Sequence, residues 1–124
     1  MPLPDQEKAT VLVVEDEPIL RMIAVDLMKE FGFDALEAAN ADQAMVTLEE
    51  RPDIRVVFTD VDMPGSMNGL MLAACIRNRW PPIDVIVTSG KTIPIPGTLP
   101  SRVSFLPKPF DLQRLTAALQ QVLN

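Results

Sequence analysis

The chain has 124 residues, of which 48% are hydrophobic and 23% are charged, a composition that fits one globular domain. A net charge of −6 without a basic cluster argues against direct nucleic-acid binding, and the lack of histidine excludes Ser-His and Cys-His catalysis, most zinc hydrolase sites and phosphohistidine donation. Cys75 is the only cysteine, which excludes an internal disulfide and fits a reducing cytoplasm, and no apolar run approaches the about 18 residues of a membrane span.

Short apolar runs alternate with stretches of helical periodicity in the first half of the chain. Pro18 suits the first turn of a helix because its missing N–H is not needed there. Apolar side chains then recur at helical spacing as far as Gly32, a natural helix stop. In chain order the pattern predicts a strand at 10–14, a helix from Pro18 to Gly32, a strand at 33–38, and a helix that Asn40 or Asp42 caps and that ends before Pro52.

The second half continues this alternation but contains one long irregular connection. In chain order it predicts a strand at 55–59, a helix between Asn68 and Trp80, strands at 84–88 and 103–106, and a helix from Asp111 to Val122. Glycines and prolines between Thr88 and Val103 argue against a helix there, because one internal proline costs about 3 kcal/mol.

The whole pattern predicts a doubly wound α/β fold with five parallel strands covered on both faces. A Pro-rich loop is expected to shorten or replace the fourth crossover helix. We expect residues 1–9 to be a flexible lead and residues 10–124 to form the domain.

Charged and polar side chains stand at the ends of the predicted strands. Glu15 and Asp16 follow the first strand, Asp60 follows the third, Thr88 ends the fourth, and Lys108 comes just after the fifth. Because the carboxyl ends of parallel strands meet at one crevice, we expect these groups to converge. A buried carboxylate is costly unless a cation satisfies it. Three acids and a lysine therefore suggest a divalent cation and a phosphoryl group.

Oxygen ligands of this kind suit Mg²⁺, which prefers octahedral coordination and keeps several waters. Asp16 and Asp60 can supply two ligands and the main-chain carbonyl of Asp62 a third, whereas Glu15 fits better as a residue that orients a metal-bound water. The positive charge of Lys108 would lie beside the phosphoryl oxygens, and the Thr88 hydroxyl could donate a hydrogen bond to them.

These residues resemble the receiver domain of bacterial two-component response regulators, over about 10–123. The motifs that carry the resemblance are Glu15-Asp16, Asp60 with Met63-Pro64 and Gly69, Thr88, and Lys108-Pro109-Phe110. The resemblance implies a flavodoxin-like sheet with strand order 2-1-3-4-5. It also makes a cis Lys108–Pro109 bond more probable than the base rate for X–Pro bonds.

The resemblance also assigns roles to individual residues. It implies that Asp60 is the phosphoacceptor, that Glu15 and Asp16 are metal-binding acids, that Lys108 contacts the phosphoryl group, and that Thr88 and Phe105 form the switch. It further implies a cytoplasmic signalling protein rather than a turnover enzyme. Its partners would be a histidine kinase or phosphotransfer protein and a downstream protein that the sequence does not identify, with no direct contact to nucleic acid or membrane.

Three features depart from the family pattern. The loop 63–69 has one residue more than the usual spacing between the phosphoacceptor and the glycine. The missing fourth helix usually belongs to the surface that partners bind. Phe105 has no hydroxyl, so its buried and exposed rotamers would differ by packing alone.

Two other functions stay open on the sequence. Residues 56–62 also resemble the nucleophile motif of haloacid dehalogenase phosphatases, with Asp60 as nucleophile and Asp62 as acid/base, but that family places its metal acids after the lysine, where only Asp111 stands. The second alternative is a pseudo-receiver that binds partners without being phosphorylated. The chain could be a stand-alone receiver, which Met1 favours, or a piece of a hybrid kinase.

Overall fold

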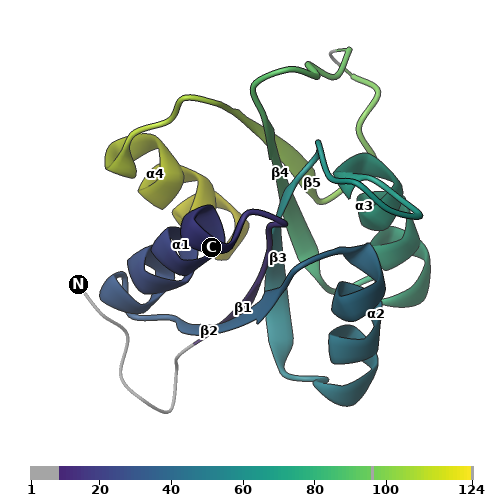
Figure 1. Cartoon of the computed structure of the whole chain (residues 1–124), viewed down its shortest axis with the longest axis horizontal. Helices are drawn as coiled ribbons and strands as arrows, with labels where there is room; N and C mark the ends of the chain where they lie inside the picture. The colour runs from purple at the N-terminus through teal and green to yellow at the C-terminus, as the bar shows by residue number, and fades with distance from the viewer. Residues whose placement is uncertain (1–8, 96, 124) are drawn as a thin grey trace.

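The computed structural model describes residues 9–95 and 97–123, which form a central sheet with helices on both faces (Figure 1). The predicted alternation of strands and helices is confirmed, with boundaries that agree to within a residue or two. In chain order the elements are β1 (Thr10–Val14), α1 (Pro18–Glu30), β2 (Asp34–Ala38), α2 (Ala41–Glu50), β3 (Ile54–Asp60), α3 (Gly69–Arg79), β4 (Asp84–Ser89), β5 (Val103–Pro107) and α4 (Leu112–Leu123).

Most of the predicted N-terminal lead, residues 1–8, lies outside the described residues. Ala9 is described and is buried, and its carbonyl accepts a hydrogen bond from the Asp34 N–H at 3.0 Å. Ala9, the last residue of the expected lead, is therefore joined to the start of β2.

The strands are parallel and lie in the order β2-β1-β3-β4-β5, as the resemblance implied. Val14 at the end of β1 pairs with Thr59, and Asp60 at the end of β3 pairs with Thr88. This register brings the ends of β1, β3 and β4 level at one edge of the sheet, which is where a doubly wound fold places its functional groups.

Helices α1 and α4 cover one face of the sheet, and α2 and α3 cover the other (Figure 1). The side chains of β1 alternate between the two layers: Val11 and Val13 pack on the α1/α4 side, whereas Leu12 and Val14 pack on the α2/α3 side. All of β1 is buried, which explains its unbroken apolar run. Each such side chain contributes roughly 1.5–3 kcal/mol on burial, so both faces hold the strand ends in place.

Asparagine side chains begin two of the helices. Asn40 Oδ1 accepts from the Gln43 N–H at 2.8 Å, and Asn68 Oδ1 accepts from the Met71 N–H at 2.9 Å. Of the two caps that the sequence allowed for α2, Asn40 is therefore the one used, and Asp42 lies in the first turn.

The apolar spacing in α1 predicts the helix but not its buried face. Ile19, Met22 and Ile23 are exposed, whereas Val25 and Met28 are buried against the sheet. Apolar residues lie on most sides of this helix, so periodicity alone does not select the inward one.

Between β4 and β5 the described residues form no helix, which confirms the predicted irregular crossover. Leu99 is partly buried against the α2/α3 layer, whereas Ile93 and Ile95 are exposed. This segment, shown in green, projects beyond the sheet at the top of Figure 1. None of the helices in the part of the chain that the structure describes is long and apolar enough to cross a membrane.

Candidate functional site

Three carboxylates meet at the edge where β1 and β3 end. Glu15 and Asp16 follow β1 directly, and Asp60 is the last residue of β3. Each offers an oxygen, and these oxygens lie within 4.8 Å of one another. We call these residues the acidic cluster. The sequence predicted their convergence from strand ends alone, and the parallel register of β1 with β3 brings it about.

Lys108 reaches the acidic cluster from the end of β5. Its Nζ lies 3.2 Å from Asp60 Oδ2 and 3.9 Å from Glu15 Oε1. The backbone N–H of Lys108 donates to the Ser89 carbonyl at 3.0 Å, which fixes the lysine beside the end of β4. The Lys108–Pro109 peptide bond is cis, as the resemblance led us to expect.

The acidic cluster is largely shielded from water and carries more negative than positive charge. Glu15 and Asp60 are each only 8% exposed. Burial raises the pKa of the Glu15 carboxyl, and repulsion from Asp60 raises it further, while Lys108 acts in the opposite direction. One lysine does not balance three acids, so this donor set of carboxylate oxygens fits a hard divalent cation such as Mg²⁺.

Two hydrogen bonds from the start of α1 hold Glu15 in place. Its Oε2 accepts from the Glu17 N–H at 3.0 Å, and its carbonyl accepts from Arg21 Nη1 at 2.9 Å. Glu15 is therefore held by the start of α1 rather than free to swing, which suits a residue that orients a neighbouring group.

Thr88 lies beside the acidic cluster, but its hydroxyl is turned away from it. The side chain is 3% exposed, and Oγ1 donates to the Leu106 carbonyl at 2.6 Å. Phe105, which the resemblance paired with Thr88, is half-buried against the α2/α3 layer. In this structure the threonine therefore bonds to β5, and it must turn before it can donate to a group on Asp60.

Asp62 contributes to the site through its backbone and is held through its side chain. Its N–H donates to Asp60 Oδ1 at 3.2 Å. Its carboxylate faces β4 and accepts hydrogen bonds from Ser89 and Thr92. Neither hydroxyl was among the predicted site residues, although Ser89 ends β4 and therefore lies at the same edge of the sheet as the predicted ones.

The loop between β3 and α3 depends on a close backbone contact at Gly69. A Cβ there would lie 2.2 Å from the Asp60 carbonyl oxygen, and the Gly69 N–H donates to the Val61 carbonyl at 3.0 Å. The longer loop is also tied to the start of α2, because Ser66 Oγ donates to Asp42 Oδ1 at 2.9 Å. These contacts fix the chain that follows Asp60.

The sequence of this chain matches a family model and several known proteins. The model described as the response regulator receiver domain matches residues 11–120. Chemotaxis protein CheY1 of Helicobacter pylori is 35% identical over 120 residues, covering 92% of this chain and 96% of CheY1.

Longer proteins match as well. The sensor kinase CckA of Brucella abortus is 36% identical over 94% of this chain, and a Rickettsia bellii response regulator described as NtrX-like is 33% identical over 90% of it. The chain spans only 13% of the length of CckA and 24% of the NtrX-like protein. The crystal structure of the receiver domain of the hybrid histidine kinase CckA superposes with a TM-score of 0.79 at 32% identity, covering 94% of this chain and all of that one.

Proposed function

Because this chain belongs to the family of response regulator receiver domains of two-component signalling, we propose that Asp60 accepts a phosphoryl group and that this changes the affinity of the domain for a protein partner. The observation that carries the proposal is the meeting of Asp60 with two further acids and a lysine at the ends of three strands. Asp60 is held for this role by Lys108 on one carboxylate oxygen and by the Asp62 N–H on the other.

The proposed reaction is an in-line transfer. One carboxylate oxygen of Asp60 attacks phosphorus and forms a P–O bond, while the bond from phosphorus to the donor breaks and its electron pair leaves with the donor. Lys108 would balance charge on the phosphoryl oxygens. Asp16, Asp60 and the Asp62 carbonyl would hold Mg²⁺, with Glu15 orienting a water beside it. When bound, Mg²⁺ would supply further neutralisation of the phosphoryl charge.

Thr88 and Phe105 are the proposed switch. A phosphoryl group on Asp60 would offer Thr88 a charged acceptor, which is stronger than the Leu106 carbonyl that it now uses. The space that Thr88 vacates lies beside β5, where Phe105 is already half-buried. Since Phe105 has no hydroxyl, any change of its rotamer would be driven by packing alone.

The donor is proposed to be a histidine kinase or phosphotransfer protein, which is consistent with the match to the receiver region of a sensor kinase. We further propose a cytoplasmic domain that signals by binding and does not turn over a substrate. The phosphatase alternative needs a metal-binding acid after Lys108. Asp111 instead is exposed and caps α4, with its Oδ1 accepting from the Arg114 N–H at 2.8 Å.

The proposal is tested with acetyl phosphate as donor. With Mg²⁺, mass spectrometry should show one phosphoryl group per chain, mapped to Asp60. Chelation of the metal should prevent labelling, and the isosteric variant Asp60→Asn should take up none. Label on another residue, or equal labelling of Asp60→Asn, would refute the proposal, and steady hydrolysis of a phosphomonoester would favour the phosphatase instead.

A further inference from the structure

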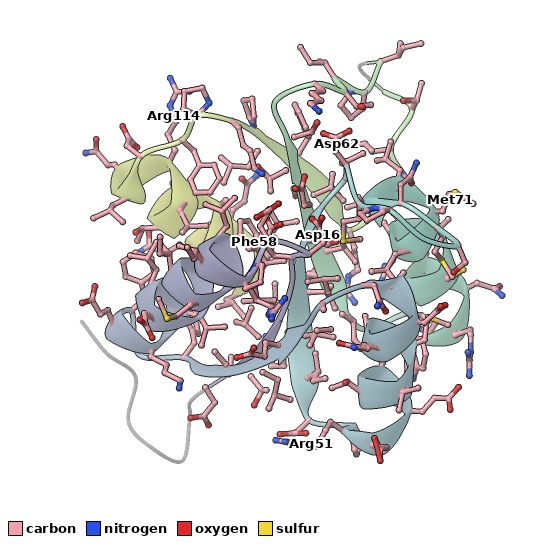
Figure 2. The ribbon with its side chains drawn as sticks, viewed as in Figure 1. Asp16, Arg51, Phe58, Asp62, Met71 and Arg114 are labelled. Carbon is pink, nitrogen blue, oxygen red and sulfur yellow. The ribbon has the colours of Figure 1, made fainter. Side chains whose placement is uncertain are left out.

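A set of hydrogen bonds joins the chain after β3 to the chain after β4. Ser89 Oγ donates to Asp62 Oδ2, and Thr92 Oγ1 donates to Asp62 Oδ1 at 2.9 Å. Ser89 Oγ in turn accepts from the backbone N–H groups of Lys91, at 3.1 Å, and Thr92, at 2.8 Å. We call this arrangement of Asp62, Ser89 and Thr92 the Asp62 lock. In Figure 2 Asp62 lies near the end of β4, at the same end of the sheet as Asp16.

The Asp62 lock is continuous with the phosphoacceptor and with the proposed switch. Asp62 follows Asp60 by two residues, and its own N–H donates to Asp60 Oδ1. Ser89 follows Thr88, whose hydroxyl is bound to the Leu106 carbonyl. The end of β4 is thus held from two sides, by Asp62 through Ser89 and by β5 through Thr88.

The lock also fixes the first turn of the irregular segment between β4 and β5. Farther along the segment, Thr98 donates from both its N–H and its hydroxyl to the Ile95 carbonyl, so these two bonds do not tie the segment to the rest of the domain. Ile93 and Ile95, which directly follow the locked turn, are exposed. Among the described residues, the start of this segment is held by Ser89 Oγ, which accepts from two of its amides, and by Asp62, which binds both the Ser89 and the Thr92 hydroxyl.

We propose that Asp62 is a positioning residue that holds the end of β4 and residues 90–95 in the unphosphorylated arrangement, and that phosphorylation of Asp60 opens this lock. This inference rests on the proposed function. Thr88 can reach a phosphoryl group on Asp60 only by giving up its hydrogen bond to the Leu106 carbonyl, which removes one of the side-chain contacts that hold the end of β4. The added charge of about −1.5 to −2 sits on the residue that accepts the Asp62 N–H, and it repels the negative charge of Asp62. Because the lock must open before the phosphorylated arrangement forms, it lowers the population that is ready for transfer and so slows the labelling of Asp60 in proportion.

Two variants separate the lock from the charge of Asp62. Asp62→Ala removes the carboxylate but keeps the backbone N–H and carbonyl. Thr92→Val keeps the carboxylate and replaces only the hydroxyl, at an exposed position where folding is not at risk. With acetyl phosphate and Mg²⁺, the initial rate of Asp60 labelling is expected to rise about three- to tenfold in Asp62→Ala and by a smaller factor in Thr92→Val, as expected from the typical net contribution of a protein hydrogen bond.

A second readout is amide hydrogen exchange. The Lys91 and Thr92 amides should exchange faster in unphosphorylated Asp62→Ala than in the wild type, and faster in the phosphorylated wild type than in the unphosphorylated one. If Asp60 were labelled faster in Asp62→Ala but not in Thr92→Val, the charge of Asp62 would explain the effect, and the proposed lock would be refuted. Normal labelling with unaltered rates and exchange in both variants would overturn this inference alone. Absence of labelling in the wild type would overturn the proposed function and the coupling together.

Discussion

Replacing Gly69 by alanine is expected to destabilise the domain by about 3 kcal/mol or more, at the upper end of what overpacking costs. The added Cβ would lie 2.2 Å from the Asp60 carbonyl oxygen and 2.8 Å from the Asp60 carbonyl carbon and from Val61 Cα. These atoms belong to the backbone of a buried strand end, so they cannot turn aside as a side chain would. Urea denaturation should show the loss, together with a melting temperature lower by roughly 10 °C or more.

Gly90→Ala is the matched control for this substitution. Its Cβ would lie 3.6 Å from Lys108 Cβ, an ordinary contact, and Gly90 has no positive φ. The stability of this variant should stay within about 0.5 kcal/mol of the wild type. If the two alanine variants were equally stable, the close approach of α3 to the end of β3 would not exist in solution.

Replacing Lys108 by methionine should slow the labelling of Asp60 by about 10²-fold or more. Methionine has a similar length but no charge, so it removes the cation that lies 3.2 Å from Asp60 and keeps most of the apolar stem. Loss of one preorganised electrostatic group typically costs about 10²–10³ in rate. The initial rate with acetyl phosphate, at saturating Mg²⁺, measures the effect.

Lys91→Met controls for the loss of a lysine near the site. Lys91 is exposed, and no carboxylate among the described residues lies within ion-pair distance of it. In Lys91→Met, the rate of Asp60 labelling should stay within about threefold of the wild-type rate, as expected when the charge removed is at the surface and screened by salt. Equal rates for Lys108→Met and the wild type would exclude Lys108 from the transfer.

Local sequence signals were enough to predict the elements and the sheet. Pro18 and the capping asparagines mark helix starts, and the prolines between β4 and β5 show why no helix forms there. The inward face of α1 could not be predicted, because Ile19 and Val25 are equally apolar and only packing makes the second one buried. Strand order came from the resemblance rather than from periodicity.

The acidic cluster was predictable for a topological reason. Residues that follow parallel strands share one edge, so Asp16, Asp60 and Lys108 start from neighbouring backbone positions and their side chains can reach one another. The direction of each hydroxyl was not predictable, because it depends on which acceptor lies nearest in three dimensions. Thr88 bonds to Leu106 and Ser89 to Asp62, and neither contact has a signal in the spacing of the residues.

The proposed phosphoryl transfer depends on one cation site at the ends of β1 and β3. A crystal structure of the protein grown with Mn²⁺, which can replace Mg²⁺ and is located by its anomalous scattering, tests this most directly. We expect one ion bound by the Asp16 and Asp60 carboxylates and the Asp62 carbonyl, with Lys108 still facing Asp60. An ion bound elsewhere, or no ion at millimolar Mn²⁺ with Lys108 turned away from the acids, would contradict the proposed function.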